Sequence, residues 1–141
     1  TFVLCLTALI LTPRQTAVVV IGYILLGAIG LPVFGGGVGG LGIIFGPRGG
    51  FFIGFLLAYT LMSLCKGRTP SFARYALVGV FISVTVTYIS ATLWLTLLFG
   101  DKFAGLVAAF MALVQYIPGD IIKAVAAALL GASLNRRMGA V

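Results

Sequence analysis

The chain has 141 residues, of which 62% are hydrophobic and 8% are charged, and its nine bases and two acids give a formal net charge of +7. A soluble domain carries about a quarter charged residues and a disordered chain has low hydrophobicity, so both classes are excluded and a membrane protein with several spanning helices remains. There is no histidine, and the only acids are Asp101 and Asp120, so we expect neither an enzyme nor a cofactor or metal site.

Five apolar segments follow one another along the chain and predict an all-α membrane protein, a helical bundle that forms one transmembrane domain over residues 1–141. A helix needs about 20 mainly apolar residues to cross a bilayer. The first segment is shorter, so we interpret it as the remainder of a longer helix. The orientation argued below places the start of the chain outside, so for a cytoplasmic N-terminus we expect one further helix before it and six helices in the parent protein. The segments are Thr1–Thr12, Gln15–Leu31, Gly50–Cys65, Arg74–Phe99 and Phe103–Leu134, the last interrupted at Pro118-Gly119.

A glycine-rich but apolar loop joins the second segment to the third, at residues 33–50. Glycine costs about 1 kcal/mol relative to alanine inside a helix, so this density of glycine predicts a loop. A plain connector would be polar, whereas this loop carries apolar side chains such as Phe34, and we therefore expect a lid that folds over a ligand. Backbone without side chains approaches a ligand closely, which favours contacts from Gly35, Gly36, Gly39 and Gly40.

Small residues recur at every fourth position in the third and fourth segments. Such stripes let helix backbones approach closely within a membrane. We expect them to pack helices within the bundle, and docking to another subunit is the alternative. The two stripes are Gly50, Gly54 and Ala58, and Gly79, Ser83, Thr87 and Ala91.

The basic residues of the loops predict the orientation in the membrane. Six bases belong to the loops after the first, third and fifth segments, and only two, Arg48 and Lys102, to the other loops. The positive-inside rule places the larger set in the cytoplasm, so the glycine-rich loop is expected outside and the C-terminus inside. The net charge is thus explained by the membrane, and no nucleic-acid partner is expected. The six bases are Arg14, Lys66, Arg68, Arg74, Arg136 and Arg137.

Asp120 and Lys123 are the strongest candidates for a binding site. They are three residues apart and therefore share a helix face, and ionisable residues within a membrane segment usually face the bundle interior or a water-filled cavity. The Pro118-Gly119 break beside them is expected to free backbone groups that a polar ligand can satisfy. Tyr116, just before this break, is expected to contact the ligand as well. A buried structural ion pair is the alternative.

Arg48 is a further candidate, at the expected external mouth of the third segment. Its neighbours are Gly46, Pro47, Gly49 and Gly50, so the guanidinium is not crowded by side chains. A guanidinium fits a carboxylate through two parallel hydrogen bonds, which favours an anchor for an anionic ligand. A headgroup-facing arginine is the alternative.

Taken in order, three stretches resemble the BioY family over essentially the whole chain. The family implies a six-helix membrane protein that binds biotin under an external loop. It acts as the substrate-binding component of an energy-coupling-factor (ECF) transporter, together with a transmembrane coupling subunit and two cytosolic ATPase subunits. By this resemblance, the first helix of the family, which carries its small-residue docking motif, is expected to be missing from this sequence. The three stretches are residues 22–34, Gly46-Pro47-Arg48-Gly49-Gly50 and Ile117-Pro118-Gly119-Asp120-Ile121-Ile122-Lys123.

The resemblance also implies roles for the candidate residues. Asp120 would accept hydrogen bonds from the ureido N–H groups of biotin, and Lys123 or Arg48 would neutralise its carboxylate. The glycine-lined loop would close over the bicyclic ring. Besides biotin, membrane lipids and the transporter subunits are the expected partners. The same class of component for another vitamin, or a channel or structural membrane subunit, remains as an alternative function.

Overall fold

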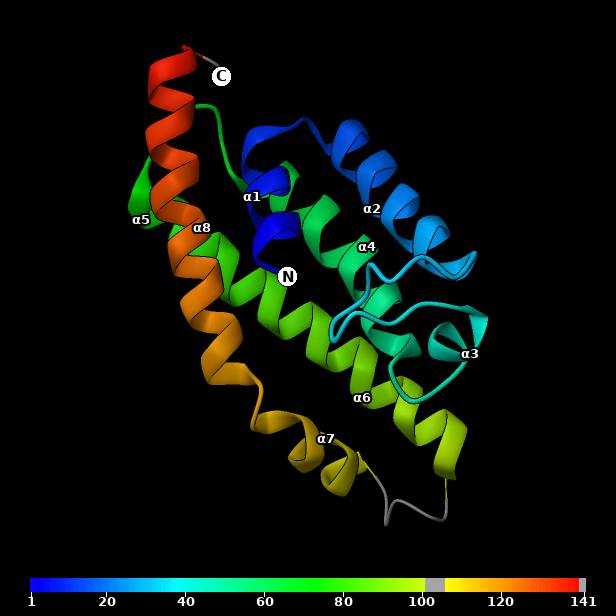
Figure 1. Ribbon diagram of the computed structural model, residues 1–141. Helices are drawn as coiled ribbons and strands as arrows, with labels where there is room; N and C mark the ends of the chain where they lie inside the picture. Colours follow the sequence, from blue (N-terminus) through cyan, green and yellow to red (C-terminus); the bar gives the residue numbers. More distant parts are fainter. Residues whose placement is uncertain (101–105, 140–141) are drawn as a thin grey trace.

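The computed structural model describes residues 1–100 and 106–139, and most of this part is helical (Figure 1). A single antiparallel bridge between Phe34 and Val38 is the only β pairing among these residues. A π-helical stretch, Gly79–Val84, joins α5 to α6, so that Phe72–Phe99 is one continuous helix. The α-helices are α1 (Phe2–Ile10), α2 (Pro13–Ala28), α3 (Leu41–Ile44), α4 (Gly49–Cys65), α5 (Phe72–Val78), α6 (Thr85–Phe99), α7 (Leu106–Val114) and α8 (Ile117–Met138).

Local sequence signals explain where several helices begin and end. At the start of α2, the Thr12 N–H donates to the Gln15 side chain at 3.1 Å, and Pro13 takes a position where a helix needs no N–H donor. α2 ends at Ala28, three residues before the expected Leu31, because Gly30 adopts a φ of 103° that does not continue a helix. The other expected boundaries agree with the structure to within two residues where the chain is described, except that α8 continues to Met138, four residues beyond the expected Leu134.

The fifth expected segment forms two helices, and its break is not at Pro118-Gly119. α7 ends at Val114 and α8 begins at Ile117, so Pro118 and Gly119 lie in the first turn of α8. Proline is tolerated there because the first N–H groups of a helix have no intrahelical partner. The expected start of this segment at Phe103 lies outside the described residues.

Small residues bring α4 and α6 into close contact. A Cβ atom on Gly50 would lie 2.4 Å from the Trp94 Cβ and 2.7 Å from the Ala91 Cα. A Cβ atom on Gly54 would lie 2.8 Å from the Thr87 Cα. A larger residue at either glycine therefore requires the two helices to move apart. The expected packing role of the small-residue stripes is confirmed at this interface.

Large apolar side chains cover the outside of the bundle. Soluble proteins rarely expose contiguous apolar surface on this scale, so the surface suits a lipid environment. Two helices, Phe72–Phe99 and Ile117–Met138, are long and apolar enough to cross a membrane, while α2 and α4 are shorter apolar helices. The most exposed apolar side chains include Leu97 (83%), Ile29 (76%), Val107 (70%) and Ile122 (70%).

The segments that carry the six bases gather at one end of the bundle. The α1–α2 link, the α4–α5 link and the C-terminal end of α8 lie together at the top of Figure 1, and the glycine-rich loop and the start of α4 lie toward the other end. One base of the smaller set, Lys102, lies outside the described residues. The separation of charge that the orientation requires is therefore present, and the orientation itself stays a prediction.

Polar side chains close the C-terminal end of α1, where the last carbonyls of a helix lack intrahelical partners. Lys66 Nζ donates to the Ala8 carbonyl at 3.2 Å and to the Leu11 carbonyl. Asn135 Nδ2 donates to the Leu9 carbonyl at 3.0 Å. These contacts tie α4 and α8 to α1. We call this group of four side chains the Lys66 cluster: Ser63, Lys66, Tyr75 and Asn135.

Candidate functional site

Asp120 lies in the first turn of α8, where the positive end of the helix dipole favours a carboxylate. Its side chain is 16% exposed. Lys123, one turn further along α8, places its Nζ 3.2 Å from Asp120 Oδ1, with its own side chain half exposed. The expected placement of the two residues on one helix face is confirmed.

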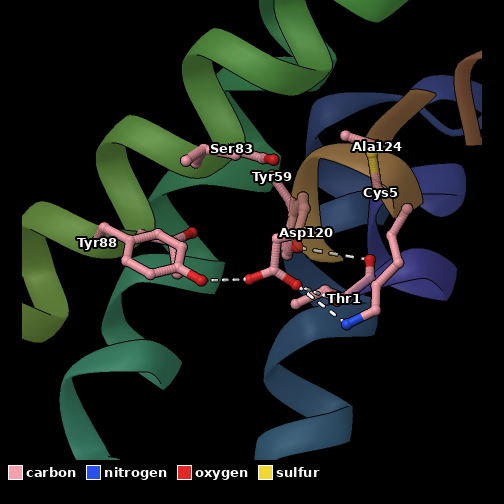
Figure 2. A pocket seen from close by; sticks show the side chains of 10 residues that line it. Thr1, Cys5, Tyr59, Ser83, Tyr88, Asp120 and Ala124 are labelled. Atoms are coloured by element: carbon pink, nitrogen blue, oxygen red, sulfur yellow. Dashed lines mark hydrogen bonds and ion pairs between the residues drawn. The ribbon is translucent and has the colours of Figure 1, made fainter. Parts of the chain in front are cut away.

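Donors from two other helices complete the surroundings of the carboxylate (Figure 2). The Tyr88 hydroxyl, on α6, donates to Asp120 Oδ2 at 2.7 Å. Thr1 Oγ1, beside α1, donates to Oδ1 at 3.2 Å. Asp120 therefore accepts three hydrogen bonds from three parts of the chain, and this arrangement fixes the orientation of its carboxylate. We call Asp120, Lys123, Tyr88 and the cavity beside them the Asp120 site.

A small cavity adjoins this carboxylate, between α1, α4, α6 and α8. Its volume is about 10 Å³, which is roughly the space that one water molecule occupies. Small-molecule pockets usually measure about 300–1,000 Å³, so the site as it stands is closed. The lining residues are Thr1, Cys5, Tyr59, Ser83, Val84, Thr87, Tyr88, Asp120, Lys123 and Ala124.

Two further polar groups face the cavity from α4 and α6. The Thr87 hydroxyl is buried and has no hydrogen-bond partner among the described residues. The Tyr59 hydroxyl donates only a long hydrogen bond, 3.5 Å, to the Thr1 carbonyl. A buried polar group without a good partner costs about 1–3 kcal/mol, so both groups are suited to bind a polar ligand. The π-helical stretch that ends at Val84 lies next to this wall, and π turns are frequent at functional sites.

The glycine-rich loop forms a second cluster, held by Arg48 and Phe34. Arg48 Nη1 donates to the Gly35 carbonyl at 3.1 Å. The Phe34 ring is buried and packs on Phe52 with a centroid separation of 4.4 Å. It also fills the space above Gly27, where a Cβ atom would lie 2.0 Å from the ring. The loop therefore folds back onto the bundle, as its apolar composition predicts.

The predicted glycine contacts have different places within this loop. Gly36 has a φ of 91° and Gly40 a φ of 109°, conformations that favour glycine. Gly40 N–H donates to the Gly27 carbonyl at 2.6 Å, and a Cβ atom on Gly39 would lie 2.2 Å from the Leu31 carbonyl oxygen. Glycine at these positions is thus explained by the fold of the loop itself.

Aromatic side chains of α4 connect the loop to the Asp120 site. Phe52, beneath Phe34, packs edge-on against Phe55 at 6.2 Å, and Phe55 packs against Tyr59 at 5.7 Å. Phe51, on the same helix, contacts the Tyr88 ring at 5.8 Å. An apolar wall therefore runs from the loop to the cavity.

The structure brings some of the sequence candidates together and separates others. Asp120 and Lys123 share the cavity, whereas Arg48, Phe34 and the four loop glycines do not line it. Tyr116 is the residue before α8, is 59% exposed and does not line it either. Sequence reasoning missed Tyr88, Thr87 and Tyr59 as site residues. Their signal was a set of hydroxyl groups in or next to the small-residue stripes: Thr87 belongs to one stripe, and Tyr59 and Tyr88 each directly follow a stripe residue.

Together, the helical bundle, its apolar surface and its polar cavity define a membrane protein with a small internal polar site. A model of the BioY family matches residues 1–140. The chain is 35% identical over 137 residues to the biotin transporter BioY of Rhizobium etli, covering 89% of this chain and 70% of that protein. It is 33% identical over 135 residues to the biotin transporter BioY of Thermotoga maritima, covering 96% and 78%. The chain belongs to the BioY family.

A solved structure shares the fold. The crystal structure at 2.1 Å of the S-component for biotin from an ECF-type ABC transporter matches with a TM-score of 0.84. The match covers 96% of this chain and 72% of that one, at 24% sequence identity. The all-helical class and the family resemblance expected from the sequence are thus confirmed.

Proposed function

We propose that this protein binds biotin and takes it up across the cytoplasmic membrane as the substrate-binding component of an ECF-type transporter. The observation that carries the proposal is the Asp120 carboxylate, oriented by three donors beside a cavity in a membrane bundle of the BioY family. Relatives with this sequence pattern are named biotin transporters, and the solved structure of the same fold is the biotin component of such a transporter. Uptake leaves the substrate unchanged and needs no catalytic residue.

The chemistry of the Asp120 site fits the ureido ring of biotin. That ring has two N–H donors and one carbonyl acceptor, and Asp120 accepts while Tyr88, Thr87 and Lys123 donate. Hydrogen bonds that involve a charged group contribute about 1.5–3 kcal/mol, more than neutral ones. The apolar thioether ring then lies against the aromatic wall of α4, which runs from the cavity to the loop.

Biotin requires the closed site to open, because the present cavity holds about one water molecule. We propose that the glycine-rich loop moves with the ligand and closes over it. The polar contacts that hold residues 34–45 to the bundle include the Arg48 hydrogen bond to Gly35 and the Gly40 hydrogen bond to Gly27, and the Phe34 ring supplies an apolar one. Hydrogen exchange should therefore show stronger protection of residues 34–45 with biotin than without it. Equal protection in both states would leave the loop a plain connector.

The same proposal assigns partners and orientation. A transmembrane coupling subunit and two cytosolic ATPase subunits would power transport, since no nucleotide-binding lysine motif occurs in this chain. The end of the bundle with six bases would face the cytoplasm and the glycine-rich loop the outside. Single cysteines at Val38 and Thr69 test this orientation. An impermeant thiol reagent applied outside should label position 38 and spare position 69.

The central test compares biotin affinity and stability in the same variants. Asp120→Asn keeps the shape of the side chain but removes its charge, so biotin affinity should fall about ten- to a hundredfold. Cys65→Ser, at an exposed position remote from the cavity, is the matched control and should bind like the wild type. Thiamine, riboflavin and folate should not compete. Wild-type affinity in Asp120→Asn, together with a lower melting temperature, would identify a structural ion pair instead.

A second comparison separates the two candidate anchors for the biotin carboxylate. If Lys123 meets the carboxylate, Lys123→Met should weaken biotin binding about tenfold or more but should hardly affect a biotin amide, which lacks that charge. If Arg48 does so, Arg48→Gln should show this pattern instead. Equal losses for biotin and its amide in both variants would contradict either assignment.

A further inference from the structure

The bundle carries a second cavity, at the end opposite the glycine-rich loop and remote from Asp120. It lies between the start of α5 and the last turns of α8, and its volume is about 320 Å³. The site described above uses none of its residues. We call this cavity the Arg136 groove, and its lining residues are Phe72, Leu129, Ala132, Ser133, Arg136 and Arg137.

Two exposed guanidinium groups at this groove have no counter-charge within the described part of the chain. The one acid described there, Asp120, is 16 residues before Arg136 on α8, or about 24 Å along the helix. It is already paired with Lys123. Neither Arg136 nor Arg137 makes an ion pair or side-chain hydrogen bond with any residue of 1–100 and 106–139. The groove therefore presents two unneutralised positive charges side by side.

Apart from Ser133, the rest of the groove lining is apolar. Phe72 is 40% and Leu129 54% exposed, and Ala132 forms the buried floor between them. Both walls belong to the two helices that are long and apolar enough to span a membrane. An apolar channel that ends at two arginines has the shape of a phospholipid: acyl chain in the channel, phosphate at its mouth.

We infer that the Arg136 groove binds one anionic phospholipid, with the headgroup phosphate on Arg136 and Arg137 and an acyl chain along Phe72 and Leu129. The groove lies at the end that carries the six bases, and the cytoplasmic leaflet, where the orientation places that end, is the anionic one. Guanidinium groups bind phosphate through two parallel hydrogen bonds. A lipid with net negative charge is favoured over a zwitterionic one, because a zwitterionic headgroup also brings a cation that the two arginines repel. This site is separate from biotin binding and does not depend on it.

The first test removes the charge. Dioleoylphosphatidylglycerol or dioleoylphosphatidylcholine is titrated into the detergent-purified protein, and bound lipid is counted by native mass spectrometry. Each basic residue near an anionic lipid raises the binding affinity about fivefold, so Arg136→Gln/Arg137→Gln should bind phosphatidylglycerol about 25-fold more weakly. Arg14→Gln/Arg68→Gln removes two exposed charges from the same end and is the matched control. Equal losses of phosphatidylglycerol affinity in the two double variants would show that general surface charge, and not the groove, attracts the lipid. That result would overturn the inference.

The second test fills the channel and leaves the charge in place. Ser133 is exposed and lines the groove, so Ser133→Trp should expel the acyl chain, whereas Leu134→Trp, at the next position and outside the lining, should not. Soluble glycerol 3-phosphate at equal concentration should not displace phosphatidylglycerol. Displacement by glycerol 3-phosphate would show a simple anion site, and equal binding of phosphatidylcholine would show unspecific lipid binding. Either result would overturn the inference. Biotin affinity should stay at the wild-type value in all these variants.

Discussion

The Asp120 site and the Lys66 cluster both place polar side chains inside an apolar bundle, but their hydrogen bonds go to different partners. In the Lys66 cluster, Lys66 and Asn135 donate to backbone carbonyls of α1. In the Asp120 site, Tyr88 and Lys123 donate to a side-chain carboxylate next to a cavity. One set of bonds closes a helix end, and the other set holds a side chain.

This difference separates polar groups that stabilise the fold from those that can bind a ligand. A backbone carbonyl within the bundle has no other donor, so losing its side-chain partner leaves it unsatisfied. The Asp120 carboxylate and its donors can instead give up their hydrogen bonds to each other and bond to the polar groups of a ligand. Variants of the Lys66 cluster should therefore lower stability alone, and variants of the Asp120 site should lower biotin affinity alone.

The largest effect should come from the interface between α4 and α6, on which both stability and biotin affinity depend. A Cβ atom at position 54 would lie only 2.8 Å from the Thr87 Cα, and Gly54→Leu adds further side-chain atoms there. We therefore expect a loss of about 3 kcal/mol in the free energy of unfolding. Biotin affinity should fall with it, because α4 and α6 carry Tyr59 and Tyr88. Gly22→Leu is the control, since nothing lies within 4 Å of a Cβ atom at Gly22. Denaturation in detergent and biotin titration would measure both; a stable Gly54→Leu protein would contradict the close packing.

The next effect should fall on stability alone. Asn135→Ala removes the hydrogen bonds that Nδ2 donates to the Leu9 carbonyl at 3.0 Å and to the Tyr75 hydroxyl at 2.8 Å. Both acceptors are buried, so the free energy of unfolding should fall by about 2 kcal/mol. Tyr75→Phe, which removes only one of the two partners, should cost less. Reduced biotin affinity in Asn135→Ala would contradict the separation of the two regions.

A smaller effect, with the opposite pattern, is expected at Tyr88. Tyr88→Phe removes the 2.7 Å hydrogen bond to Asp120 but keeps the ring that packs on Phe51. Biotin affinity should fall about fivefold, the equivalent of about 1 kcal/mol, while the melting temperature changes little. Tyr75→Phe is the matched control, since it also removes one hydroxyl but belongs to the Lys66 cluster. Unchanged affinity in Tyr88→Phe would assign its hydroxyl to the fold.

These contrasts also show which features the sequence predicts. Apolar runs predict the helices because about 20 apolar residues are what a bilayer requires, and the pairing of Asp120 with Lys123 follows from helix periodicity alone. Tyr88 joins them from 32 residues away along the chain. Such a contact depends on how helices pack, which no local pattern specifies.

The placement of the helix break shows the same limit. Proline next to glycine predicts a break, yet proline also suits the first turn of a helix, and only tertiary packing decides between the two. Here α8 begins at Ile117, which puts Asp120 in its first turn. Arg48 and Phe34 illustrate a related point. Their types suggest ligand contacts, which stays a prediction; the structure adds that they hold the loop to the bundle, and no local pattern specifies that.

The smallest effect concerns the pH dependence of the Lys66 cluster. Lys66 follows the last residue of α4, and burial lowers the pKa of its ammonium from the ordinary value of 10.5. Between the folded and the unfolded pKa, the unfolded chain binds more protons than the folded one, so the stability contributed by this residue rises with pH. Below the folded pKa, the cost of burying the charge is constant.

The difference in unfolding free energy between wild type and Lys66→Met isolates this residue from all other titrating groups. As the pH of the detergent solution is raised from about 8 to about 10, the wild type should become more stable relative to Lys66→Met. Arg68→Gln is the control: it removes a nearby exposed basic side chain and leaves Lys66 in place, so its difference from wild type should stay flat. Biotin affinity should be unchanged in both variants. A flat profile for Lys66→Met would mean that Lys66 Nζ keeps its proton as easily in the bundle as in water, which its burial argues against.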